Sequence, residues 1–239
     1  MQEYRVPFDG DPDWNDLSSE ALAKEEVKIG VEEYRVGENQ QKNYCFLIDK
    51  TSALHDMHIR FYLERNAKLV VEILIASTSI NVHVECTLLG VGADARIMGA
   101  YILDSSNKVT ITTTQHHDVA RARSTLVMKG VLRDNAHAHY HGIIRVEKEA
   151  QGTYTSQENK NMLLSNNARA VSVPSLEVLA HDVHCAHGSA TGRFDEEQLF
   201  YAAARGIDEK TAQQLLLNAF LADFFVDEQL NDKVKLLIG

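Results

Sequence analysis

Cysteine, proline and tryptophan are scarce in this sequence of 239 residues, which has 3 Cys, 3 Pro and 1 Trp. The three cysteines (Cys45, Cys86 and Cys185) are odd in number and far apart, which argues against a disulfide framework and is typical of reduced thiols in the cytoplasm. With only 13 Gly, the chain also lacks a collagen-like or low-complexity composition. Its hydrophobic content of 44% is ordinary, so we expect one globular domain with a proper core.

Basic residues are outnumbered, with 24 Lys and Arg against 34 Asp and Glu and a net charge of −10. No basic cluster is present, which argues against a nucleic-acid partner bound through phosphate contacts. The longest apolar run, Leu69 to Ala76, is interrupted by Glu72 and is too short to span a membrane. The acidic N-terminus lacks the features of a secretory signal. We therefore expect a soluble, cytoplasmic protein without a membrane partner.

Motifs of the common enzyme classes are missing as well. The glycine-containing stretches at 90–99 and 188–193 do not end in the Gly-Lys-Ser/Thr of a phosphate-binding loop, so the chain is not expected to hydrolyse ATP by itself. No Gly-x-Ser-x-Gly elbow and no His-Glu-x-x-His metal helix occurs in the sequence. These absences favour a non-enzymatic protein.

Three segments differ in their hydrophobic pattern. Residues 1–28 form a polar entry segment, in which Ser18 or Ser19 is expected to cap a short acidic helix. Residues 29–192 have short alternating runs typical of strands, such as Ile80, Val82 and Val84 on one face. Residues 193–239 have helical periodicity. We predict a β core from 29 to 192 and a C-terminal helical domain from 193 to 239.

Small-residue turns recur along the β segment at intervals of roughly 14 to 26 residues, with one larger gap that we expect to hide a further turn. The predicted turns are Asn66-Ala67, Gly92-Ala93, Asn135-Ala136, Glu149-Ala150, Asn167-Ala168 and Ser189-Ala190. Such intervals are typical of the coils of a β-solenoid. A β-sandwich has turns at similar intervals, so periodicity alone leaves both architectures open.

The helical segment has clear start and stop signals. A first helix is predicted between an N-cap at Asp195 and Gly206, a second begins after Asp208, and a third covers Asp227 to Leu237. The second is expected to have an apolar stripe of Ala212, Leu215, Leu216, Ala219 and Phe220. The exposed part of these helices is a candidate docking surface for a partner. Alternatively, the stripe packs on the end of the β domain.

Histidine is frequent, with eleven in the chain. His137, His139 and His141 are expected to lie on one face of a strand and to be solvated there, and His116 and His117 to lie in a loop. A second group, His181, Cys185 and His187, would share the face of another strand, with His184 on the opposite face. Thiolate and imidazole ligands suit zinc or iron, including iron–sulfur species. A structural role for these residues remains open.

Amide side chains at Gln157, Asn159 and Asn161 repeat on every second residue. On a strand they would lie on one face, where amides can form a hydrogen-bonded ladder inside a solenoid. Exposed surface amides are the other interpretation.

An ordered set of motifs resembles the SufB/SufD family. These motifs are His116-His-Asp-Val-Ala-Arg-Ala-Arg-Ser-Thr, Lys129-Gly-Val-Leu-Arg-Asp, Gly142-Ile-Ile-Arg-Val, Gln157-Glu-Asn-Lys-Asn-Met-Leu-Leu-Ser, Pro174-Ser-Leu-Glu-Val, Asp182-Val-His-Cys-Ala-His-Gly-Ser-Ala-Thr-Gly, Glu197-Gln-Leu-Phe-Tyr and Arg205-Gly-Ile. The resemblance covers residues 110 to 225 and implies a right-handed parallel β-helix followed by a C-terminal helical domain. It therefore favours the solenoid over the sandwich.

The resemblance implies a role in iron–sulfur cluster assembly by the SUF system. Family members form a SufB/SufD pair or a homodimer and bind the SufC ATPase through their C-terminal helices. In this chain the implied docking residues are Glu197, Leu199, Phe200, Tyr201 and Arg205. Reduced flavin is implied for some complexes of the family, but no flavin site is recognisable here.

Two departures from the SufB pattern make the sequence SufD-like. Asn159 stands where the SufB member has a cysteine, and Gly188 stands where it tends to have a glutamate. The Cys185-Ala-His187 segment matches the SufD-type Cys-x-His, whose histidine is implied to contribute to a cluster shared with the partner. We therefore expect a SufD-like scaffold subunit. The alternatives are a homodimeric scaffold that assembles the cluster itself and a structural adaptor that only recruits the ATPase.

Overall fold

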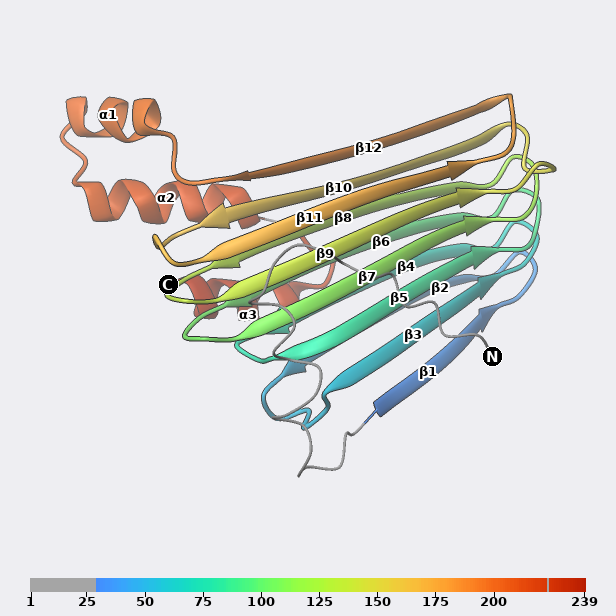
Figure 1. Cartoon of the computed structure of the whole chain (residues 1–239), viewed down its shortest axis with the longest axis horizontal. Helices are drawn as coiled ribbons and strands as arrows, with labels where there is room; N and C mark the ends of the chain where they lie inside the picture. Colours follow the sequence, from blue (N-terminus) through green and yellow to red (C-terminus); the bar gives the residue numbers. More distant parts are fainter. Residues whose placement is uncertain (1–28, 223) are drawn as a thin grey trace, which may run out of the picture.

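The computed structural model describes residues 29–222 and 224–239, and its β domain is a solenoid of parallel strands (Figure 1). The short helix predicted near Ser18 lies outside the described residues. Successive strands alternate between two six-stranded sheets, which we call the odd sheet (β1-β3-β5-β7-β9-β11) and the even sheet (β12-β10-β8-β6-β4-β2). The β-solenoid prediction is confirmed over the sandwich, because every recorded strand pair is parallel. Its right-handed sense stays a prediction.

The strands have nearly equal lengths, as stacked coils require. They are β1 (Ile29–Val36), β2 (Gln41–Asp49), β3 (Asp56–Leu63), β4 (Lys68–Ala76), β5 (Ile80–Leu88), β6 (Asp94–Leu103), β7 (Lys108–His117), β8 (Arg123–Leu132), β9 (His137–Val146), β10 (Thr153–Leu163), β11 (Arg169–Val178) and β12 (Val183–Gly192).

Every second side chain of a strand points into the lumen between the two sheets. In β5, Ile80, Val82 and Val84 are buried as predicted, while the residues between them point outward. The early coils fill the lumen with Ile, Val, Leu and Phe side chains. The later coils place polar side chains there, including Gln115, His117 and Asn159. The character of the lumen therefore changes along the solenoid axis.

Buried alanines mark the corners where the chain passes between the sheets, because only a small side chain fits inside the bend. The predicted turns at Ala67, Ala93, Ala136, Ala150 and Ala168 are confirmed, and all five alanines are buried. Some corners require left-handed backbone, as at Asn66 (φ 53°) and Gly92 (φ 78°).

The larger gap between predicted turns contains two further corners. One lies at Ser105 (φ 54°), between β6 and β7, and the other at Arg121 (φ 57°), followed by the buried Ala122. The turn predicted at Ser189-Ala190 is wrong, because both residues lie inside β12 and pair there with β10. The loop predicted at His116 and His117 is also wrong, since these residues end β7.

Three helices follow the solenoid: α1 (Glu196–Ala204), α2 (Glu209–Leu221) and α3 (Glu228–Ile238). Each begins after an aspartate (Asp195, Asp208 or Asp227) whose side chain accepts a backbone N–H of the first turn, so the three predicted helices are confirmed. No helix in the described ranges is long and apolar enough to cross a membrane.

Helices α2 and α3 cover the outer face of the even sheet. Leu217, Leu221 and Val234 pack there against Leu74 of β4 and Met98 of β6. Packing on the β domain, the alternative left open by the sequence, therefore accounts for most of this segment.

The prediction of which α2 residues form the buried apolar stripe is partly wrong. Ala212 is buried as expected, but Leu217 and Leu221 are the other buried residues, while Leu215 and Ala219 are exposed. The run Leu-Leu-Leu-Asn-Ala-Phe-Leu is apolar almost all round the helix, so its periodicity could not select the buried side.

Candidate functional site

The predicted site residues Cys185 and His187 lie on the last coil of the solenoid. Strand β12 ends the even sheet and β11 ends the odd sheet, and no described strand lies beyond them in the solenoid (Figure 1). In the register of β10 and β12, Cys185 lies beside Thr155 and His187 beside Gln157. The inward face of β12 therefore continues the polar row of β10 into an open end of the solenoid.

Burial separates the roles that the two side chains can take. Cys185 is partly buried against the apolar cluster of Ile144, Val146, Ala150 and Ala180, and this burial raises the pKa of its thiol. His187 is exposed at the open end. The imidazole is thus the accessible ligand, whereas the thiol is held in its protonated form.

The other histidines of this segment point elsewhere. His184 lies on the outer face, where its ring stacks on Tyr154 with a centroid distance of 4.7 Å. The prediction that His181 shares the face of Cys185 is wrong, because β12 begins only at Val183. His181 lies in the preceding turn, and its backbone N–H donates to Gln151 Oε1 at 3.2 Å.

Behind the open end, Asn159 and Asn161 of β10 form the hydrogen-bonded ladder that was one of the two interpretations of the sequence, while Gln157 does not join it. The interpretation as surface amides is wrong, because all three side chains are buried. Asn161 Nδ2 donates to Asn159 Oδ1 at 2.9 Å, and Asn159 Nδ2 donates to Tyr101 Oη at 3.0 Å. Asn159, where the resemblance implies a departure from the SufB pattern, is therefore engaged in structural hydrogen bonds.

Gly130 makes this ladder possible. It lies between Tyr101 and Asn161 in the strand register, and their side chains hydrogen-bond across it. A Cβ atom at this position would lie 2.2 Å from the Tyr101 ring and 2.4 Å from Asn161 Oδ1. The Lys129-Gly motif therefore has a direct steric reason.

A second polar group lies beside the ladder in the lumen. Ser124 Oγ accepts a hydrogen bond from Gln115 Nε2 at 2.6 Å and lies 2.8 Å from His117 Nε2. Burial lowers the pKa of His117 to about 4, so its imidazole is neutral. Sequence reasoning missed this group, although the alternating Thr113, Gln115 and His117 continue the inward face of Val109 and Ile111.

Several buried polar atoms near the open end have no hydrogen-bond partner among the described residues. They include both amide atoms of Gln157 and Oγ of Ser172. The Gln157 amide lies against Gly142, where a Cβ atom would be only 2.4 Å from its Nε2. An unpaired buried amide costs about 1–3 kcal/mol. The Gln157 amide, directly beside His187 in the register, therefore has unused hydrogen-bonding capacity next to the open end.

The residues of the implied docking region lie on α1, which has no buried residue, and at Arg205, which caps its C-terminal end. Phe200 is 77% exposed and Tyr201 is 60% exposed. The Arg205 guanidinium lies 5.0 Å from the centre of the Tyr201 ring. Leu199 lines a cavity of about 510 Å³ between α1, α2 and the adjacent strand ends. The first turn containing Glu197 is capped by Asp195, with a distance of 2.8 Å from Glu197 N to Asp195 Oδ1.

Comparison with known proteins agrees with the fold and with these motifs. The family model described as "SUF system FeS cluster assembly, SufBD core domain" matches residues 16–220. An iron–sulfur cluster assembly SufBD family protein of Mycobacterium leprae is 34% identical over 161 residues, which cover 64% of this chain and 41% of that protein. The iron–sulfur cluster assembly protein SufD of Escherichia coli is 36% identical over 137 residues, which cover 56% of this chain and 32% of that protein.

A plant relative matches over a longer stretch. Protein ABCI7, chloroplastic, of Arabidopsis thaliana is 27% identical over 244 residues, covering 90% of this chain and 50% of that protein. The chain thus spans about a third to a half of the length of these three relatives. Because the family model covers most of the chain, the protein belongs to the SufBD family of iron–sulfur cluster assembly proteins.

Proposed function

We propose that this chain is a SufD-like, non-enzymatic scaffold subunit of the SUF system, and that its open solenoid end takes part in a cluster site shared with a partner. The observation that carries the proposal is the position of His187, exposed and in register with the unpaired amide of Gln157. An imidazole can ligate iron, whereas the amide of Asn159 is a poor iron ligand. The thiolate would therefore come from a SufB-type subunit, or from a second copy of this chain.

The surface around His187 supports pairing through this end. Leu176 and Val178 lie on the inward face of β11, next to the buried Ile144 and Val146 of β9, yet they are 40% and 39% exposed. Leu179, which follows β11, is 56% exposed. Apolar side chains at an uncovered solenoid end form a surface that a partner would bury.

The proposal includes a SufC-type ATPase docked on α1 through Glu197, Leu199, Phe200, Tyr201 and Arg205. Exposed aromatic residues next to an arginine are frequent at the energetic centre of protein interfaces. ATP would be hydrolysed by that partner, since this sequence has no phosphate-binding loop. The free state of Cys45, Cys86 and Cys185 supports a cytoplasmic location. We assign no residue of this chain to reduced flavin.

The test is anaerobic reconstitution with iron and sulfide, followed by visible absorbance and by iron and labile sulfide content. We expect a cluster when the chain is mixed with a SufB-type subunit and the ATPase. His187→Ala should reduce cluster yield in the mixture at least severalfold, because a ligand is lost. His184→Ala is the matched control on the same strand and should retain the cluster, since this ring lies on the outer face.

The other outcomes separate the alternatives. A cluster on the chain alone, lost in His187→Ala or Cys185→Ala, would contradict the need for a partner and support the homodimeric scaffold. ATPase binding together with full cluster yield in His187→Ala would contradict the ligand role and support the structural adaptor.

A further inference from the structure

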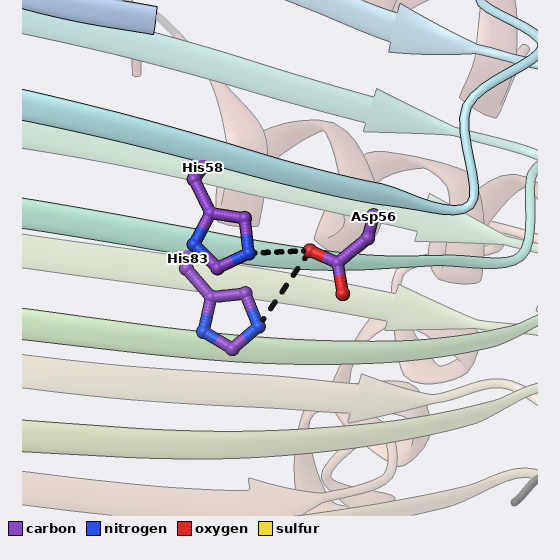
Figure 2. Close-up of side chains that lie close together, drawn as sticks. All are labelled: Asp56, His58 and His83. Carbon is purple, nitrogen blue, oxygen red and sulfur yellow. Dashed lines mark ion pairs between the residues drawn. The ribbon is translucent and has the colours of Figure 1, made fainter. Parts of the chain in front are cut away.

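A group of metal-binding side chains lies far from the open end, on the outer face of the odd sheet. Asp56 and His58 project from β3, separated by one residue, and His83 of β5 is the direct register neighbour of His58 (Figure 2). One ligand atom from each of the three residues lies within 4.8 Å of the others. No part of the proposed cluster site at β10 and β12 contributes to this group.

Both imidazoles approach the same carboxylate oxygen. Asp56 Oδ1 lies 3.0 Å from His58 Nε2 and 3.8 Å from His83 Nε2, as the dashed lines in Figure 2 show. In a tetrahedral zinc site with bonds of about 2.1 Å, neighbouring donor atoms are about 3.4 Å apart. The two observed distances lie on either side of this value, so Asp56 Oδ1 is already close to the required distance from each imidazole.

The two rings need only a small adjustment. They stack with a centroid distance of 4.4 Å and an interplanar angle of 7°. Rotation about χ2, which is a soft torsion in histidine, would direct both Nε2 lone pairs at an ion beside Asp56. Burial, together with the neighbouring His58, lowers the pKa of His83, which favours the neutral imidazole that binds metals.

The Asp56 carboxylate lacks a hydrogen-bond donor to its Oδ1 in the described part of the chain, and a bound cation would take the place of that donor. Its Oδ1 is buried and accepts no hydrogen bond from the described residues. The 3.0 Å contact with His58 brings the two groups close but does not have hydrogen-bond geometry. A buried carboxylate oxygen without a donor is costly, and metal coordination is one of the arrangements that compensate it.

The surrounding charges do not oppose a bound cation. Arg60, the next outward residue of β3, is the nearest guanidinium on that strand. It is neutralised by Glu33 on one side at 2.9 Å and by Glu85 on the other at 3.6 Å. Beside His83, the register neighbour on β7 is Thr112, which is uncharged.

A second cluster on the same sheet shows why the first is the stronger candidate. His116, Asp118 and Glu147 also come within ligand distance of one another. There, however, Arg145 Nε lies 2.7 Å from Glu147 Oε1, and both acids already pair with His116. In that cluster a guanidinium already neutralises the Glu147 carboxylate, whereas Asp56 Oδ1 has no hydrogen-bond donor among the described residues.

We propose that Asp56, His58 and His83 form a binding site for one divalent transition-metal ion of the zinc or ferrous class, with water completing the coordination. Two imidazoles and one carboxylate are the donor set that such borderline ions prefer over calcium or magnesium. The site lies on β3 and β5, so the ion would join two neighbouring coils and stabilise their register.

The test is titration of the purified full chain with Zn²⁺, and anaerobically with Fe²⁺, in a Cys185→Ala/His187→Ala background that removes the candidate ligands at the open end. We expect one ion per chain and an X-ray absorption spectrum of the zinc form with two imidazoles and oxygen. His83→Ala and Asp56→Asn should each weaken zinc binding at least tenfold, because loss of a direct ligand costs no less than the roughly 10–100-fold caused by loss of an outer-shell partner.

His139→Ala is the matched control, since His139 is a partly buried histidine on the outer face of the same sheet and outside the cluster. It should bind zinc like the parent. Circular dichroism and thermal melting without metal establish that each variant is folded, and Asp56→Asn keeps the shape of the side chain if an alanine variant does not fold. Unchanged zinc affinity in folded Asp56→Asn, or a spectrum without imidazole scattering, would overturn the assignment. The readout uses no SUF partner, so it is independent of the proposed function.

Discussion

At the scale of single residues, one residue type takes different roles according to the face and coil on which it lies. His117 points into the lumen and is fully buried. His58 and His83 lie on the outer face beside a carboxylate, and His187 lies at the open end. Burial opposes the charged form of an imidazole, whereas exposure leaves it available to ligands. Strand parity and coil position therefore decide the chemistry of each histidine.

The buried imidazole predicts how stability depends on pH. The pKa of His117 is about 4 in the folded chain, against 6.5 for the ordinary side chain. Between these values the unfolded chain binds more protons, so the free energy of unfolding falls as the pH falls. From pH 7 to pH 5, His117 should account for a loss of about 2 kcal/mol.

Urea unfolding at the two pH values checks this expectation. His117→Gln should lose this part of the pH dependence, while His184→Gln, which changes an exposed imidazole, should retain it. An equal pH dependence in wild type and His117→Gln would contradict the assignment of the effect to this side chain.

At the scale of elements, charged side chains from the even sheet hold the ends of the helices. Glu72 of β4 accepts the backbone N–H groups of Val226 and Asp227, where α3 begins. Lys129 of β8 donates to Phe220 O at 2.6 Å near the end of α2. A carboxylate at a helix N-terminus and an ammonium at a helix C-terminus each interact favourably with the helix dipole. The helices are therefore oriented on the sheet by polar contacts as well as by apolar packing.

Removal of the Glu72 carboxylate should loosen α3. Glu72→Ala leaves two partly buried N–H groups without an acceptor, which should cost about 1–3 kcal/mol of unfolding free energy. Glu64→Ala removes an exposed ion pair with Arg35 (2.8 Å) and should cost less than about 1 kcal/mol. Urea unfolding and amide exchange in α3 measure both changes, and equal effects in the two variants would contradict the anchoring role of Glu72.

Helix α1 differs from α2 and α3 because it has no buried residue, and its aromatic residues Phe200 and Tyr201 are exposed. If a SufC-type ATPase docks there, Phe200→Ala should weaken its binding at least tenfold, since buried aromatic anchors often contribute 2 kcal/mol or more. Leu236→Ala is the control, because Leu236 is an apolar residue 81% exposed on α3. A binding titration with the ATPase compares the two, and equal affinities would place the docking surface elsewhere.

At the scale of the whole molecule, the two ends of the solenoid differ. The early coils have an apolar lumen, and helices cover the outer face of the even sheet at β4, β6 and β8. The later coils have a polar lumen that ends in the uncovered strands β11 and β12 (Figure 1). A solenoid is stabilised by contacts between neighbouring coils, so an end coil lacks one of its two neighbours. Pairing with another solenoid would replace it.

If the solenoid pairs through this end, a charge introduced at the last coil should weaken association more than a charge introduced at β1. Leu176→Glu should weaken association with a SufB-type subunit, or with a second copy, at least tenfold, because a carboxylate would be desolvated at the interface. Val31→Glu, at a position 58% exposed on β1, should have little effect. Light scattering during size-exclusion chromatography measures both. Association lost in neither variant, or in both, would contradict pairing through the last coil.

The sequence by itself determined the β segment with five of its corners, the three helices and the family. These depend on local signals: alternation along a strand, small residues at bends, aspartate caps and ordered motifs. It could not determine which side of α2 is buried, that the amides of β10 lie in the lumen, or that Asp56 and His58 meet His83. These features depend on which coil lies beside which residue, since strand neighbours more than 20 residues apart in the chain are brought together only by the register. Only the tertiary structure therefore decided where the polar groups meet, because the free energy of a polar side chain is set by the neighbours and the solvent that the fold provides.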